Sequence, residues 1–183
     1  MKIILFLIAF GASCLAQAQA QTLTITEQQL NSQLNRHLDR EFPMTLGDWL
    51  SAGIRLRDIG VELGRTEADK ARVSGRGVIS LRQGQTDYHW DISGDFIARP
   101  RYDSEQGALY LEEFELLNYR LNEDGVSPQM SFMLPMLLQG VAGYLSQYPV
   151  YTLDPQDPLQ QQLRESVLSL EVQPGRILLH GLD

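Results

Sequence analysis

SPQMSFMLPMLLQGVAGYLSQY, residues 127–148, is the stretch that the rest of the chain has to accommodate. Ser127 is a suitable N-cap, and Pro128 suits the first helical position, where a missing N–H has no partner to lose. Apolar residues recur at helical spacing, and no residue of the stretch is charged. The pattern therefore predicts a long helix that is wetted on little of its surface and that a sheet must cover.

Two interpretations of this helix stay open. Met130, Met133 and Met136 lie close together in it, and thioether side chains suit surfaces that accept varied apolar ligands. The same residues also suit an ordinary core, which is the usual reason for an apolar helical face. Pro135 removes one hydrogen-bond donor and is expected to bend the helix.

Residues 1–20 have the features of a secretory signal peptide: a positive charge at Lys2, an apolar run and a small-residue end. Ala18 and Ala20 fit cleavage before Gln21. Alternatively, Cys14 ends a lipobox-like sequence and becomes the lipidated first mature residue. Cleavage before Gln21 is favoured, because Gly11 stands where a lipobox usually carries an aliphatic side chain. Either kind of processing predicts an exported protein, which is periplasmic or anchored to a membrane as a lipoprotein.

Removal of residues 1–20 leaves residues 21–183, the size of one domain with a real core. Cys14 is the only cysteine, so the form that begins at Gln21 has neither disulfides nor a thiol nucleophile. The net charge of −8 argues against nucleic acid as a partner and against attachment to anionic headgroups by charge. Apolar contacts would have to supply any affinity for lipid.

The sequence before and after the helix predicts mostly strands. Residues 24–42 form the exception, because Leu30, Leu34 and Leu38 recur every four residues after a capping box at Thr26 and Gln29. Segments in which apolar and polar residues alternate then predict a four-stranded meander over residues 54–121. At residues 57–58 and 112–113 the apolar residues move from one set of alternate positions to the other, which implies a β-bulge at each place. A short helix and a hairpin with a type II turn at residues 173–176 complete the chain.

Because no strand–helix–strand alternation occurs, the expected class is α+β with an antiparallel sheet. The specific expectation is a curved antiparallel meander wrapped around the long apolar helix, with a second, N-terminal helix and a C-terminal β-hairpin.

Several segments also resemble a known family. They are ITEQQLN (residues 25–31), YDSEQGALYL (102–111), PVYTL (149–153) and EVQPGRI (171–177), and they resemble, in this order, the YceB-like bacterial envelope lipoproteins. The resemblance covers essentially the whole mature chain, and the family is functionally uncharacterised. It implies a fold similar to one module of the tubular lipid-binding (TULIP) superfamily, in which a sheet wraps a long helix beside an apolar groove.

The expected function is that of an envelope protein that binds lipid or another long apolar ligand beside the central helix. Seven residues are predicted to line the groove: Leu30, Leu34, Leu38, Met130, Met133, Met136 and Leu137. The alternative is a structural or partner-binding protein with a closed core. No enzyme activity, cofactor or metal site is expected, because the nucleophile elbow and the zinc motifs are absent from the sequence. His37 and Glu41, one turn apart, lack a second pair of ligands.

Overall fold

A computed structural model describes residues 21–37, 41–45, 50–83, 85–122 and 128–181. The predicted signal peptide, with Cys14, lies outside these residues. The elements, in chain order, are β1 (Thr22–Thr26), α1 (Glu27–His37), β2 (Glu41–Thr45), β3 (Leu50–Leu63), β4 (Ala71–Gln83), β5 (Thr86–Asp103), β6 (Ala108–Leu121), α2 (Pro128–Leu145), β7 (Tyr151–Thr152), α3 (Pro158–Leu163), β8 (Val167–Gln173) and β9 (Arg176–Gly181).

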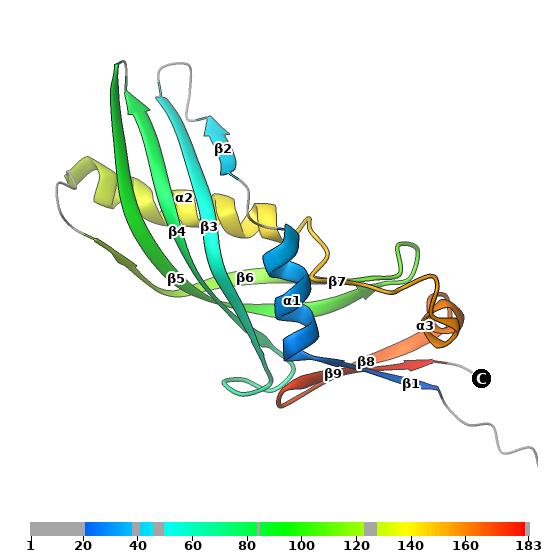
Figure 1. The fold of residues 1–183 in the computed structure, drawn as a ribbon. Coiled ribbons are helices and arrows are strands. Elements are labelled where there is room, and N and C mark those ends of the chain that lie inside the picture. Colours follow the sequence, from blue (N-terminus) through cyan, green and yellow to red (C-terminus); the bar gives the residue numbers. More distant parts are fainter. Residues whose placement is uncertain (1–20, 38–40, 46–49, 84, 123–127, 182–183) are drawn as a thin grey trace, which may run out of the picture.

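The strands form two antiparallel sheets (Figure 1). The large sheet has the order β2-β3-β4-β5-β6-β7, so its middle is the predicted meander of consecutive strands. The small sheet has the order β1-β9-β8 and adds β1 to the predicted C-terminal hairpin. The type II turn of that hairpin is confirmed by the φ of +86° at Gly175.

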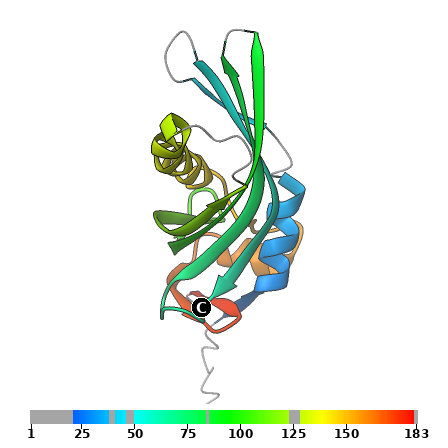
Figure 2. The same ribbon diagram turned by 90° about the vertical axis from the view of Figure 1, so that its left-hand side faces the viewer.

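The predicted fold class was wrong. The described chain is mostly β, and neither sheet is closed around a helix. α2 lies across one face of the large sheet as a cover (Figure 2), with Met136, Gln139 and Gly143 exposed on its other side. The prediction was wrong because a helix without charged residues was expected to expose little of its surface to water and to be wrapped by a sheet. Here glycine, glutamine and one exposed methionine are enough to form the solvent side.

The N-terminal helix is shorter than predicted. Thr22–Thr26 is a strand, and Phe42 belongs to β2 instead of ending the helix. The capping box that starts α1 is confirmed: Thr26 N donates to Gln29 Oε1 at 2.9 Å, and Gln29 N donates to Thr26 Oγ1 at 3.4 Å. A period of four in the sequence cannot tell one long helix from a helix that is followed by a strand, because apolar residues line one side of either element.

α1 covers an edge of the large sheet. β2 pairs with β3 only as far as Arg55, and beyond that point side chains of α1 bind the free edge of β3. Asn31 accepts from Val61 N at 2.7 Å and donates to Val61 O at 3.3 Å. Asn35 makes the same pair of hydrogen bonds with Ile59, at 3.2 and 2.9 Å. Glu27 accepts from Leu63 N at 2.7 Å.

These three side chains sit four residues apart on α1 and meet every second residue of β3. Each carboxamide presents one donor and one acceptor, as a neighbouring strand would. An unpaired edge is a template for aggregation, so α1 both adds Leu30 and Leu34 to the core and closes the edge.

The two predicted bulges are confirmed. The β3–β4 register shifts between Arg57 and Gly60, and Asp58 has a φ of +48°. The β5–β6 register shifts opposite Glu113, whose φ is +54°. A bulge increases local twist, and the long strands of the large sheet accordingly splay and turn along their length (Figures 1 and 2). One hydrophobic cluster joins both sheets, α1 and α2.

Candidate functional site

Two hollows lie on opposite faces of the large sheet. The first, here called the apolar hollow, lies between α2 and strands β3, β4 and β5. Its lining is almost wholly apolar and includes Ile54, Ile59, Val73, Phe96, Leu138, Val141 and Leu145. Its volume is about 30 Å³, which is room for about two water molecules.

Glycines on the sheet create the apolar hollow. Gly75 and Gly94 are paired across β4 and β5 and present no side chain to Leu138, Val141 or Leu145 of α2. A Cβ at Gly75 would approach only Ile59 Cγ1, at 3.7 Å, and one at Gly94 would lie 3.5 Å from Phe96 Cε2. Both distances are ordinary contacts, so the missing methyl groups leave real space.

The structure places the predicted groove residues in different surroundings. Leu30, Leu34 and Leu137 are buried in the core cluster, whereas Met136 is 63% exposed and faces away from the sheet. Leu38 and the side chains of Met130 and Met133 lie outside the described residues. None of the four described residues lines the apolar hollow. Leu138, Val141 and Leu145, which do line it, belong to the apolar stripe that the sequence showed.

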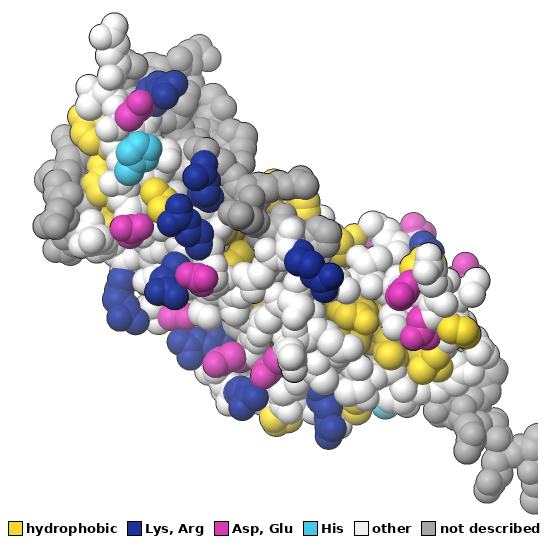
Figure 3. Space-filling view, viewed as in Figure 1, with side chains coloured by type: hydrophobic (Ala, Val, Ile, Leu, Met, Phe, Trp, Pro, Cys, Tyr) yellow, Lys and Arg dark blue, Asp and Glu magenta, His cyan; other side chains and the backbone are white. Residues whose placement is uncertain are grey.

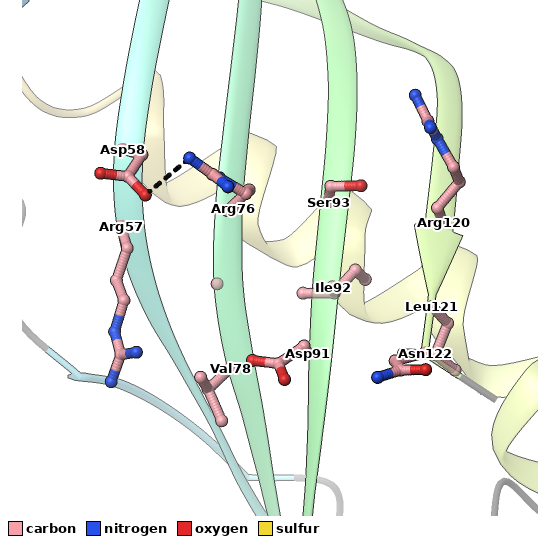
Figure 4. A pocket seen from close by; sticks show the side chains of 11 residues that line it. Arg57, Asp58, Arg76, Val78, Asp91, Ile92, Ser93, Arg120, Leu121 and Asn122 are labelled. Carbon is pink, nitrogen blue, oxygen red and sulfur yellow. Dashed lines mark ion pairs between the residues drawn. The ribbon is translucent and has the colours of Figure 1, made fainter. Parts of the chain in front are cut away.

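The second hollow, here called the polar hollow, lies on the opposite face of the sheet and has a volume of about 500 Å³. A row of side chains in register crosses it. Arg57 on β3 pairs with Arg76 on β4, Arg76 with Ser93 on β5, and Ser93 with Arg120 on β6. Residues directly opposite each other in antiparallel strands share a face. These four residues, the arginine row, therefore point to the same side, and Figure 4 shows α2 behind them.

Carboxylates accompany the arginine row. The bulge turns Asp58 toward Arg76, and its Oδ2 lies 3.2 Å from Arg76 Nη2 (Figure 4). Aspartate tolerates the positive φ that this turn requires. Asp91 lies below the row on β5, and its carboxylate points toward Val78 of β4 in Figure 4; the backbone N–H of Asn122 donates to Asp91 O at 3.0 Å. Dark-blue side chains, the colour of Lys and Arg, gather over this part of the long strands in Figure 3.

The polar hollow was missed at the sequence level because its residues come from four strands. Arg57, Arg76 and Arg120 are far apart in the chain, and only the register of three strand pairs brings them together. Their alternation with inward apolar residues indicated a solvent-facing side and nothing more. Among the described residues, no group of three or more His, Cys, Asp or Glu side chains is arranged to hold a metal ion.

The fold and its two hollows define an open antiparallel β protein with a helix laid over one sheet face. Residues 25–176 match the profile of a family described as "Protein of unknown function (DUF1439)". The chain therefore belongs to this family, which agrees with the YceB-like resemblance. No helix in the described part of the chain is long and apolar enough to cross a membrane.

Curated relatives bear one name. The chain is 28% identical over 167 residues to the "Uncharacterized lipoprotein YceB" of Escherichia coli (strain K12), a match that covers 90% of this chain and 89% of the relative. It is 26% identical over 162 residues to the protein of the same name from Salmonella typhimurium, with 88% and 87% covered. These relatives are named as lipoproteins, and their names state no function.

Proposed function

We propose that this protein is an exported, non-enzymatic envelope protein that binds an apolar chain, such as the acyl chain of a lipid, between α2 and the large sheet. The observation that supports this function is the apolar hollow, where Leu138, Val141 and Leu145 face sheet glycines across unfilled space. The envelope location is supported by the lipoprotein names of the relatives. The same names favour the alternative in which Cys14 is lipidated and anchors the protein to a membrane.

Uptake of the ligand requires α2 to move. A volume of about 30 Å³ is far below the 300–1,000 Å³ of ordinary ligand pockets, so an acyl chain enters only as the helix shifts outward. Desolvation supplies about 25 cal/mol per Å² of apolar surface buried. The outer side of α2, with Met136, Gln139 and Gly143, is exposed, so an outward shift breaks few contacts there.

A second function is favoured by the same small volume. If α2 stays in place, the core is closed and the protein acts as a structural or partner-binding component of the envelope. The two functions differ in what the purified protein carries. Solvent extraction followed by lipid mass spectrometry, together with titration by a fluorescent fatty acid, separates them. An empty protein that also fails to take up the fatty acid contradicts the ligand-binding function.

Filling the apolar hollow tests its role directly. In the double variant Gly75→Ala/Gly94→Ala, two methyl groups occupy the space without a close contact. We expect the free energy of unfolding to rise by about 0.5–1 kcal/mol per site, because glycine within a strand is less stable than alanine. We also expect at least a tenfold weaker affinity for the fluorescent fatty acid, measured by titration.

Gly143→Ala is the matched control. A Cβ at Gly143, on the exposed side of α2, meets nothing within 4 Å, and alanine stabilises a helix interior by about 1 kcal/mol relative to glycine. The control is therefore stabilised to a similar degree while the hollow stays open, and its affinity is expected to remain within twofold of the unmodified protein. Unchanged affinity in the double variant would place the ligand elsewhere.

A further inference from the structure

The polar hollow has the properties of a small-ligand site independent of the apolar one. Its volume of about 500 Å³ falls in the usual range for such sites. It lies on the face of the sheet that α2 leaves open, so a molecule can reach it without any movement of the helix (Figure 4). The arginine row extends over three strand spacings, roughly 14 Å from Arg57 to Arg120.

Two guanidinium groups in this hollow are available to a ligand. Arg76 is engaged by Asp58 at 3.2 Å. The guanidinium groups of Arg57 and Arg120 make no hydrogen bond or ion pair with any residue in the described parts of the chain. In a chain with a net charge of −8, two unpaired arginines on one face are a local positive site. Guanidinium groups bind phosphate oxygens through two parallel N–H donors, which makes arginine well suited to this anion.

The remaining polar groups are suited to hydroxyls. Asp91 accepts hydrogen bonds, Ser93 donates and accepts, and the Asn122 carboxamide does both. The carboxylate of Asp91 makes no hydrogen bond or ion pair with the residues that the structure describes. Two carboxylates among three arginines repel a dense polyanion, so the hollow favours a ligand with one anionic group and several neutral hydroxyl groups.

We propose that the polar hollow binds the phosphate ester of a polyol. The side chains of Arg57 and Arg120 extend in opposite directions in Figure 4, so both turn toward Arg76 to hold the phosphate between them. The hydroxyl groups lie against Asp91 and Asn122. Such a group is present both in free glycerol phosphates and in the headgroup of phosphatidylglycerol. Arg76, Gly77 and Ile92 line both hollows, from the strands that separate them. The inference nevertheless does not depend on lipid uptake beneath α2, because the hollows open on opposite faces of the sheet and the tests substitute different residues.

The experiment measures binding of two probes to the purified protein. Glycerol 3-phosphate is titrated by isothermal calorimetry, and vesicles of phosphatidylcholine with phosphatidylglycerol are tested by co-sedimentation against vesicles of phosphatidylcholine alone. In Arg57→Gln/Arg120→Gln, we expect at least a tenfold loss of affinity for whichever probe the protein binds. Binding of glycerol 3-phosphate identifies a free ester as the ligand, and binding of the vesicles alone identifies a headgroup.

Two further variants make the test specific. Arg99→Gln removes one exposed arginine from β5 outside the hollow, where it pairs with Glu113 at 3.2 Å, and should change affinity less than twofold. Asp91→Ala should weaken glycerol 3-phosphate binding, since the hydroxyl acceptor is lost, and should strengthen binding of inorganic phosphate, since a repelling charge is lost.

Three outcomes would overturn the proposal. The first is the absence of binding to either probe. The second is an equal loss of affinity in Arg99→Gln, which would mean general attraction by charge. The third is stronger binding of both glycerol 3-phosphate and inorganic phosphate by Asp91→Ala, which would show that this carboxylate contributes nothing to recognition of the polyol.

Discussion

Replacing Asn31 and Asn35 together by alanine is expected to lower the free energy of unfolding by about 2–4 kcal/mol. The double variant removes four hydrogen bonds between α1 and the edge of β3, at 2.7, 3.3, 2.9 and 3.2 Å. Two of the freed backbone groups belong to Val61, which is buried. A buried polar group without a partner retains the full cost of its desolvation.

Helix propensity opposes this loss of stability, so a measured loss can be attributed to the missing hydrogen bonds. Alanine is a better helix former than asparagine, so a purely local effect on α1 would stabilise the variant. Gln28→Ala is the matched control, because Gln28 is an exposed residue of the same helix without a hydrogen bond from its side chain to the described residues. The measurement is urea denaturation followed by circular dichroism. A double variant as stable as Gln28→Ala would show that the hydrogen bonds between α1 and the edge of β3 contribute nothing.

The same double variant should also aggregate. With the carboxamides gone, the N–H and C=O groups of Ile59 and Val61 form an uncovered strand edge next to the open end of β2. Light scattering during storage at 37 °C is expected to rise in the double variant and not in Gln28→Ala. Infrared spectroscopy of the aggregates then separates the two effects of the asparagines, because general destabilisation without edge pairing would leave aggregates with little added β-structure.

Local features of this fold could be predicted from the sequence. The bulges at Asp58 and Glu113 follow from changes of inward parity, and the turn at Gly175 and the capping box at Thr26 follow from residue types at fixed spacing. Each of these features depends only on residues that are close together in the chain. The C-terminal hairpin was predictable for the same reason.

Long-range features could not be predicted. The pairing of β1 with β9 joins residues at opposite ends of the chain, and no local pattern carries that information. The position of α2 depends on the shape of the sheet, which stays open on the side where a wrapped helix was expected. The arginine row needs the register of three strand pairs at once.

One signal for the hydrogen bonds between α1 and the edge of β3 was present in the sequence. Glu27, Asn31 and Asn35 recur every four residues beside the Leu30–Leu34 stripe, which places them at the border of the buried face. A polar residue at such a border either faces water or binds backbone. A single sequence cannot decide between these, because the choice depends on whether β2 extends far enough to pair with all of β3.

Glu27→Ala is expected to lower the free energy of unfolding by about 2–3 kcal/mol at pH 7, because hydrogen bonds to charged groups are the strongest ones. The Glu27 carboxylate accepts from Leu63 N at 2.7 Å and binds Arg65 through both oxygens, each at 2.9 Å. It also lies in the first turn of α1, where a negative charge is favourable. Glu67→Ala, which removes an exposed ion pair with Lys70, should cost less than about 1 kcal/mol.

The pH dependence of this difference identifies its cause. The hydrogen bond from Arg65 is the largest contribution that lowers the pKa of Glu27 below its ordinary value of 4.5, and the Leu63 N–H adds to it. A group with a lowered pKa in the folded state stabilises the protein fully above its unfolded pKa and loses that contribution as the pH falls through the folded value. The unmodified protein should therefore lose stability below about pH 4.5 more steeply than Glu27→Ala. If denaturation curves at pH 7 and pH 3 gave the same difference between the two proteins, the ionised carboxylate would not be the source of the stabilisation.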